Sequence, residues 1–327
     1  SGEEAKFKDA VDVLAADEER KGNVPLATKI RNAYANKKKS KAAAPEFASS
    51  APSFTMQSAS GAPRDRESLL ELYELITPEV SLDDVILPDS QRKIIDQVIG
   101  EQKNAEELLK HKMDPVNRML LCGPPGCGKT MTAQAIAHEL GLPIAYVRLD
   151  GLVSSYLGQT STNLRKVFDS VRNQRIILFL DEFDAIAKKR DDSNELGELK
   201  RVVTTLLQNF DNMPGNVFLI AATNHEHLLD PAIWRRFNVT ITLDLPGEEQ
   251  RKSLLEKWLS DYGIGKKAKI DFDLLAKISA GQNGAQIREL CSAAGKAYLL
   301  SGSLKTEDVT NILIQQQTKF SSENEEA

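Results

Sequence analysis

Residues 123–130 read Gly-Pro-Pro-Gly-Cys-Gly-Lys-Thr, and they stand between an apolar stretch, 118–122, and a helical pattern, 129–140. Glycines at this spacing let backbone N–H groups turn toward one anion, which the positive end of the next helix also attracts. Lys129 can reach the β- and γ-phosphates of a nucleotide, and the Thr130 hydroxyl can bind Mg²⁺. The stretch therefore has the form of a phosphate-binding loop, G-x-x-x-x-G-K-[ST].

Two carboxylates, Asp181 and Glu182, follow the apolar run 176–180. Such a run fits a strand buried in a parallel sheet, and ligands bind beyond the carboxyl ends of such strands. There Asp181 could hold a metal ion and Glu182 could activate an attacking water. The alternative for the pair is an exposed acidic helix start, which the strand before it disfavours. Together, the loop and the strand end predict hydrolysis of a nucleoside triphosphate.

Apolar segments with strand character alternate with helical patterns through the middle of the chain. Helices are expected at 66–76 and 90–109, and strands at 118–122, 144–149, 176–180, 217–222 and 239–243. This alternation predicts an α/β fold, a three-layer doubly wound parallel sheet of the P-loop NTPase type. After Pro246 the strands stop, and four helices are expected at 247–262, 271–277, 284–300 and 306–317. These helices predict a C-terminal helical lid.

The amino-terminal part has a different organisation. Helical spacing over 1–40, interrupted at Gly22, predicts a small N-terminal helical hairpin that either docks a partner or packs on its own chain. Ala, Ser and Pro dominate 41–65 and predict a flexible linker. The expected domains are the hairpin 1–40, the linker 41–65, a large α/β subdomain 66–245, the helical lid 246–320 and an acidic tail 321–327.

Composition narrows the function. The chain of 327 residues carries 27% charged residues, a formal net charge of −5 and three cysteines. A negative net charge argues against extensive nucleic-acid binding, and three cysteines provide no paired disulfide framework. No apolar run approaches the roughly 20 residues of a membrane helix, and the amino terminus does not resemble a secretion signal. We therefore expect a cytoplasmic protein without a membrane anchor.

Two further blocks follow the carboxylate pair in order. Residues 221–224 read Ala-Ala-Thr-Asn and end a strand, and residues 230–237 read Asp-Pro-Ala-Ile-Trp-Arg-Arg-Phe. With the phosphate loop and the strand end, these blocks resemble the AAA+ family of ring ATPases, in its substrate-remodelling (protein-threading) branch. The resemblance covers roughly 81–317. It implies that Asn224 positions water against the γ-phosphate, although an asparagine after a strand is by itself more often a turn former.

Arg235 and Arg236 resemble the arginine fingers of the katanin and spastin type. A guanidinium supplied by a neighbouring subunit stabilises charge on the transferring phosphoryl group. The alternative is a pair of arginines in surface ion pairs. As fingers, the two residues imply a homo-oligomer, by family resemblance a hexamer, in which the next subunit completes each active site.

The stretch 154–159, Ser-Ser-Tyr-Leu-Gly-Gln, resembles the pore loop of that branch. Tyr156 and Leu157 would then grip an extended polypeptide in a central channel. The alternative is a Tyr-Leu pair packed in the core. A highly charged stretch, 188–198, resembles a second and weaker pore-facing loop.

The resemblance also implies a nucleotide site drawn from several parts of the chain. Val85 and Ile86 would begin the adenine pocket, and Gly284 and Ala285 would let the lid backbone approach the base. The lid arginine that many AAA+ ATPases use as a second sensor is absent, and Arg288, one turn further on, is expected on the helix surface. The implied nucleotide contacts are Val85, Ile86, Pro125, Gly126, Cys127, Gly128, Lys129, Thr130, Met131, Gly284 and Ala285, with Thr130 and Asp181 as metal ligands.

The leading hypothesis is a ring-forming, Mg²⁺-dependent ATPase that uses ATP to unfold, remodel or thread protein substrates through a central pore. Adenine over guanine comes from the resemblance, and no guanine-reading N-K-x-D motif is present. A separate protease or an adaptor could dock on the N-terminal hairpin. The alternatives are a nucleic-acid-handling AAA+ remodeller or loader, and a nucleotide-gated scaffold without turnover, which Glu182 disfavours.

Overall fold

The computed structural model describes residues 71–149, 157–187, 196–264 and 270–325, which all belong to one compact unit, 60–327. The predicted hairpin and linker, residues 1–65, lie outside the described residues, as do Tyr156 and most of the charged stretch 188–198. No described helix combines the length and the apolar composition that crossing a bilayer would need.

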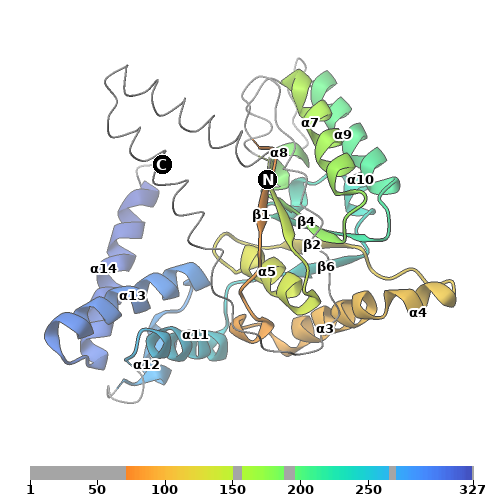
Figure 1. Cartoon of the computed structure of the whole chain (residues 1–327). Coiled ribbons are helices and arrows are strands. Elements are labelled where there is room, and N and C mark those ends of the chain that lie inside the picture. The colour runs from red at the N-terminus through yellow and green to blue at the C-terminus, as the bar shows by residue number, and fades with distance from the viewer. Residues whose placement is uncertain (1–70, 150–156, 188–195, 265–269, 326–327) are drawn as a thin grey trace, which may run out of the picture. The chain divides into compact units, whose positions relative to one another are not determined.

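The strands of the described chain form one six-stranded sheet in the order β1-β3-β4-β5-β2-β6 (Figure 1). The strands are β1 Glu74–Ile76, β2 Arg118–Cys122, β3 Ile144–Arg148, β4 Ile176–Asp181, β5 Val217–Thr223 and β6 Val239–Thr242. Strands β2 to β6 pair in parallel, whereas β1 pairs antiparallel with β3 at one edge. Because β5 lies between β2 and β4, the carboxyl ends of these three strands meet on one side of the sheet.

Helices cover both faces of the sheet (Figure 1). Helices α3 (Asp89–Lys103) and α5 (Lys129–Leu140) contribute to the core on one face, and α7 (Leu157–Val171) and α9 (Leu196–Asp211) contribute to the core on the other. The shorter helices are η1 Leu82–Asp84, α4 Ala105–Lys110, α8 Asp184–Ala187, η2 Glu226–Leu228 and α10 Pro231–Trp234. The predicted three-layer α/β fold with a mostly parallel sheet is therefore confirmed.

Four helices after the sheet form a helical bundle with a core of its own. They are α11 Glu248–Asp261, α12 Phe272–Ile278, α13 Gly284–Ser301 and α14 Thr306–Glu325. Leu255, Leu275 and Leu290 are fully buried in this core and come from α11, α12 and α13 respectively. The predicted C-terminal helical part is confirmed, but α14 continues to Glu325, so most of the expected acidic tail is helix.

The prediction of a helix at 66–76 is wrong for residues 71–76, the part that the structure describes. Residues Glu74–Ile76 form strand β1, in which Leu75 pairs with Ala145 of β3. Leu72 and Tyr73, just before the strand, are buried in the sheet core. Short apolar runs fit a helix and a strand about equally well, and the free edge of β3 supplied the backbone partners that decided between them.

The single helix predicted at 90–109 is two helices, α3 and α4. Asn104 stands at their junction with φ −106° and ψ 21°, outside helical values. Its side-chain amide donates to the Gly100 carbonyl oxygen (2.8 Å). Asparagine side chains compete for backbone groups in this way, so the helix breaks although the apolar periodicity continues.

Candidate active site

The phosphate-binding loop connects β2 to α5, as predicted, and at two of its glycines a Cβ would collide with neighbouring atoms. Gly123 has φ +132°, and a Cβ there would lie 2.1 Å from the Leu243 carbonyl oxygen. Gly126 has φ +75°, and a Cβ there would lie 2.8 Å from the Asn283 side chain. Only glycine therefore lets the loop begin beside β6 and continue past the start of α13.

Lys129 begins α5 and is buried, with 8% of its surface exposed. Its Nζ donates to the carbonyl oxygens of Gly123 (2.7 Å) and Pro124 (2.8 Å). Burial lowers the pKa of the Lys129 ammonium from its ordinary value. The amine therefore lies at the loop itself, where phosphate oxygens would be stronger acceptors than these carbonyl oxygens.

Asp181 ends β4, and its carboxylate accepts three hydrogen bonds. Oδ2 accepts from the hydroxyls of Thr130 (3.2 Å) and Tyr146 (2.9 Å), and Oδ1 accepts from the Glu182 N–H (2.9 Å). The structure thus brings together Thr130 and Asp181, the two predicted metal ligands. A hydroxyl and a carboxylate fit Mg²⁺, which keeps water and substrate phosphates for its other positions.

Tyr146 is a site residue that the sequence did not reveal. Burial, followed by the charge of Asp181, raises the pKa of the Tyr146 hydroxyl above its ordinary value. Tyr146 therefore stays protonated at neutral pH and donates to Asp181. It lies within an apolar strand, β3, and only the pairing of β3 with β4 brings the two residues together.

Glu182 adopts a left-handed backbone conformation, φ 52°, which residues with side chains rarely occupy. Such a conformation costs on the order of 1–2 kcal/mol. The neighbouring Phe183 N–H donates to the Ala222 carbonyl oxygen of β5 (2.8 Å) and so holds the turn against the sheet. A strained turn that the surrounding structure maintains is typical of functional sites, which favours the predicted catalytic role of Glu182.

Asp184 couples this turn to the end of β5. Its carboxylate, on a residue that is 7% exposed, accepts from the Thr223 hydroxyl (3.2 Å) and the Asn224 N–H (3.4 Å). Asn224, the predicted first sensor, is thereby held near the end of β4. The sequence did not single out Asp184, because a further carboxylate in an acidic stretch resembles ordinary surface charge.

These elements line one cavity of about 940 Å³, a size typical of small-molecule sites. The cavity is lined by every predicted nucleotide contact, namely Val85, Ile86, Pro125, Gly126, Cys127, Gly128, Lys129, Thr130, Met131, Gly284 and Ala285. Asp181, Glu182 and Asn224 line the same cavity. Burial raises the pKa of the Cys127 thiol, so this loop cysteine is protonated at neutral pH.

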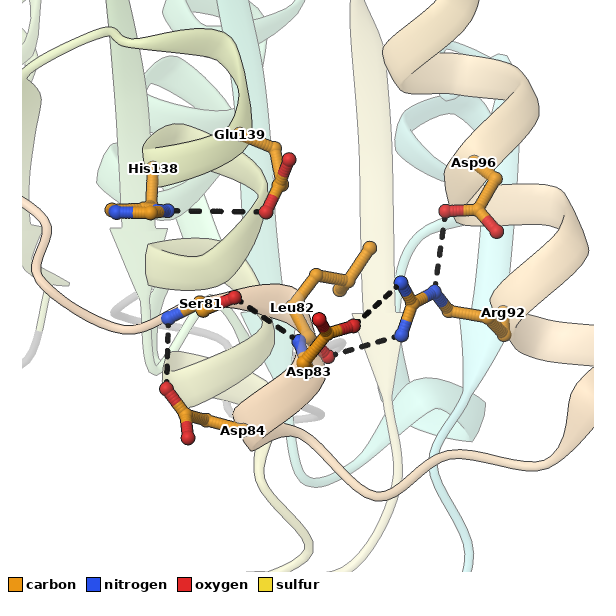
Figure 2. Close-up of polar contacts among 8 residues, drawn as sticks. All are labelled: Ser81, Leu82, Asp83, Asp84, Arg92, Asp96, His138 and Glu139. Atoms are coloured by element: carbon orange, nitrogen blue, oxygen red, sulfur yellow. Dashed lines mark hydrogen bonds and ion pairs between the residues drawn. The ribbon is translucent and has the colours of Figure 1, made fainter.

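The segment that enters the cavity at Val85 is held in place at its start (Figure 2). The Ser81 N–H donates to Oδ2 of Asp84 (3.1 Å) within the capping box of η1. Arg92 of α3 donates to the Leu82 carbonyl oxygen (3.2 Å). The backbone before Val85 is therefore attached to helix α3.

Asp84 also links this segment to the lid. Its other carboxylate oxygen lies 2.6 Å from Nζ of Lys257 on α11. The hydrogen bond from Lys257 lowers the pKa of Asp84, and the same bond raises the pKa of Lys257. The pair is therefore fully charged at neutral pH. Its contribution is lost only below the ordinary carboxyl pKa, as Asp84 protonates, or above the ordinary lysine pKa, as Lys257 deprotonates.

The start of α13 contacts the phosphate-binding loop directly. Asn283 Nδ2 donates to the Pro125 carbonyl oxygen (3.1 Å), and the Ala285 N–H donates to the Gly126 carbonyl oxygen (3.1 Å). A Cβ on Gly284 would lie 3.2 Å from that same Gly126 oxygen. The predicted lid residues therefore approach the loop backbone as well as the cavity.

Several lid residues that were not predicted as contacts also line the cavity, among them Trp258, Tyr262 and Arg288. The guanidinium carbon of Arg288 lies 4.8 Å from the centroid of the Trp258 ring. Arg288 is exposed, as expected, but the surface on which it lies is the cavity wall. The packing of the lid against the loop decides which turns of α11 and α13 face the cavity, and no local pattern encodes it.

Arg235 and Arg236 lie at the end of α10, outside the cavity. Arg236 forms a bidentate ion pair with Asp211 of α9 (3.2 Å from both Nε and Nη2) and donates to the Ala232 carbonyl oxygen (3.1 Å). Arg235 is exposed, and its side chain has no ion pair or hydrogen bond with any residue that the structure describes. One arginine is thus held within its own chain, and the other is available to a second chain.

Gly126→Ala tests the loop. An alanine would be strained at the observed φ of +75°, and its Cβ would collide with the Asn283 side chain, so the loop or that side chain must shift. We expect ATP affinity to fall by at least about tenfold, because a hydrogen bond to a charged phosphate is worth roughly 1.5–3 kcal/mol. Calorimetric titration measures this, with Gly100→Ala on α3, which meets no atom within 4 Å, as the control. An unchanged affinity would contradict the role of the loop.

The fold and the cavity define a P-loop nucleotide-binding protein with a helical lid. Comparison of its sequence with those of known proteins identifies the family within this class. Residues 119–245 match the family described as ATPases associated with various cellular activities (AAA). An uncharacterised AAA family ATPase, y4kL, of Sinorhizobium fredii is 38% identical over 301 residues, which are 91% of this chain and 86% of that protein. A proteasome-activating nucleotidase of Methanothermobacter thermautotrophicus is 35% identical over 226 residues, which are 67% of this chain and 55% of that protein.

The chain belongs to the AAA family of ATPases. This confirms the predicted family, the P-loop class and the ATPase activity. The finer assignment to the katanin and spastin type is not supported by these relatives and stays a prediction. Tyr156, predicted as a pore residue, lies outside the described residues, and Leu157 begins α7.

Proposed function

We propose that this ATPase works as a homo-oligomeric ring, hydrolyses ATP with Mg²⁺ and uses the energy to unfold or thread protein substrates. Proteins of the AAA family typically form oligomeric rings. The observation that chiefly supports the proposal is that the predicted catalytic groups do not all lie in one cavity. Lys129, Asp181 and Glu182 line one cavity, whereas Arg235, whose side chain pairs with none of the described residues, lies outside it. A second subunit would bring that arginine to the site.

Within one subunit, the described side chains suit hydrolysis of a terminal phosphate. Lys129 and the N–H groups of the loop would bind the phosphates, and Glu182 would accept a proton from the attacking water. The Asn224 amide would orient that water. Thr130 and Asp181 would hold Mg²⁺, which would neutralise charge on the phosphate oxygens.

The lid would respond to the state of the nucleotide through two contacts. Helix α13 is hydrogen-bonded to the loop at Pro125 and Gly126, and α11 is paired with Asp84. A shift of the loop after loss of the γ-phosphate would therefore turn the lid relative to the sheet. In a ring, this motion would carry Tyr156 and Leu157 along a central channel.

The protein substrate is suggested by the name of one relative, a proteasome-activating nucleotidase. By analogy, a separate protease or an adaptor would bind the hairpin 1–40. The nucleic-acid alternative has less support, because the chain carries a net charge of −5.

Tyr156→Ala is expected to leave ATP hydrolysis largely intact and to slow protein unfolding by about tenfold or more, as loss of an aromatic anchor from a binding surface does. The assay follows the fluorescence of green fluorescent protein with a disordered tail, in the presence of a trap for unfolded chains. Tyr156→Phe keeps the aromatic side chain and serves as the control.

Two further results of this assay bear on the proposal. Unfolding at the normal rate by Tyr156→Ala would remove the pore assignment. ATPase stimulation by DNA, but not by unfolded protein, would favour the nucleic-acid alternative. A chain without residues 1–40 should keep its ATPase activity and lose delivery to any protease that the full chain supports.

A further inference from the structure

The cavity has two chemically different ends. Lys129 and Thr130 stand at the phosphate end, with the N–H groups of the loop. The rest of the lining includes Val85 and Ile86 on the sheet side and Trp258 on the lid side. A triphosphate bound to the loop would place its nucleoside against the rest of the lining, so the walls there would hold the nucleoside.

The lid wall is built around the indole of Trp258. The Arg288 guanidinium carbon and the Lys257 Nζ lie 4.8 and 5.9 Å from the ring centroid, within cation–π range. Tyr262 stacks with the same indole, with 6.5 Å between centroids and 25° between planes. Three side chains from α11, its C-cap and α13 therefore hold one aromatic ring at the cavity.

The indole N–H of Trp258 lacks a partner. It is buried and has no hydrogen-bond acceptor among the described residues. Buried donors are nearly always paired, and leaving one unpaired is destabilising. Trp258 lines the cavity in which the nucleoside would lie, although its N–H is covered by protein atoms. A nucleoside offers ring nitrogens and ribose oxygens that could accept this bond once the indole turns toward it.

The ion pair between Asp84 and Lys257 joins the two walls of this end. Asp84 directly precedes Val85, Lys257 directly precedes Trp258, and the two charged groups are 2.6 Å apart. Val85 and Trp258 therefore belong to adjoining walls. A flat base that contacts one wall is expected to reach the other.

We propose that Trp258 contacts the nucleoside of the bound nucleotide and determines the affinity of the site for it, with Arg288 and Tyr262 as positioning residues that hold the indole. The proposal rests on the proposed binding of ATP in this cavity. A phosphate contact by Arg288 is the competing interpretation, and the experiments separate the two.

Trp258 can be observed directly, because the chain contains two tryptophans. The other, Trp234, is 38% exposed and lies outside the cavity. In a Trp234→Phe chain, saturating ADP is expected to change the emission of Trp258 by more than it changes the emission of a Trp258→Phe chain. If the emission of Trp258 does not change at an ADP concentration that calorimetry shows to be saturating, the proposal is overturned.

Trp258→Ala is expected to raise the Kd for ATP and for ADP by the same factor, about tenfold, as loss of an aromatic partner of a base does. Inorganic tripolyphosphate, which has no nucleoside, should bind this variant as tightly as the unaltered chain. Arg288→Ala should weaken ATP and ADP equally and by less. An unchanged Kd for Trp258→Ala, an equal loss of tripolyphosphate binding, or a loss confined to ATP in Arg288→Ala would each contradict the assignment.

The outcomes also separate this proposal from the one on which it rests. If the unaltered chain binds neither ATP nor ADP, both proposals fail. If it binds both and the Trp258 variants bind equally well, only the nucleoside contact fails. Trp258→Phe keeps an aromatic ring without the N–H, so it should unfold at the temperature of the unaltered chain and bind with intermediate affinity.

Discussion

Glu182→Gln is expected to reduce steady-state ATP hydrolysis by about 100- to 10,000-fold, the usual contribution of a general base. The amide has nearly the same shape as the carboxylate but cannot accept a proton from the attacking water. Both side chains face the same backbone strain at φ 52°, so the turn should persist. ATP binding should therefore remain, and calorimetry together with phosphate release would show binding without turnover.

A carboxylate on the neighbouring helix provides the control for this change. Glu139 lies on α5, with a side chain that is 32% exposed, and it does not line the cavity. Glu139→Gln should therefore hydrolyse ATP at the normal rate. Turnover by Glu182→Gln at that same rate would show that another group activates the water.

Arg235→Ala is expected to reduce hydrolysis by about 1,000- to 100,000-fold, the range seen when an arginine supplied by a neighbouring chain is lost. The reason is that charge builds up on the transferring phosphoryl group, and a guanidinium from another subunit would balance that charge. Because Arg235 lies outside its own cavity, ATP binding by the isolated chain should be unaffected.

A mixture of two inactive variants tests whether the site is shared. A chain with Arg235→Ala keeps Glu182, and a chain with Glu182→Gln keeps Arg235. Where the first adjoins the second in a ring, one complete site forms, so mixing should restore part of the activity. No recovery in rings that demonstrably contain both variants would argue against completion between subunits.

The same assay separates the two arginines. Asp211→Ala removes the ion pair of Arg236 and leaves its guanidinium in place. If Arg236 mainly ties α10 to α9, Asp211→Ala and Arg236→Ala should show the same modest loss of stability. If Arg236 is also a finger, only Arg236→Ala should abolish turnover.

Much of the fold could be predicted because its signals are local. The loop at 123–130 is recognised from the spacing of its glycines, and the strands β2 to β6 are apolar runs bounded by turns. Strand β1 could not be predicted, because three residues with a mixed pattern become a strand only beside the free edge of β3. The break at Asn104 was hidden by an apolar stripe that continues across it.

The residues of the site also fall into those that the sequence could predict and those that it could not. Residues within motifs, such as Lys129 and Asp181, could be named from the sequence because motif order implies their place. Tyr146, Asp184 and Trp258 could not, because each makes its contact with a residue on a different element.

The sequence by itself determined the class of this protein: a phosphate-binding loop, a carboxylate pair after a buried strand, and the α/β order that brings them together. These features depend on backbone conformations and periodicities that neighbouring residues encode. Only the tertiary structure decided which lid side chains wall the cavity, which arginine is held by its own chain, and how Asp84 joins the sheet side to the lid. Those relations depend on contacts between residues far apart in sequence, such as Asp84 and Lys257, and packing alone creates them.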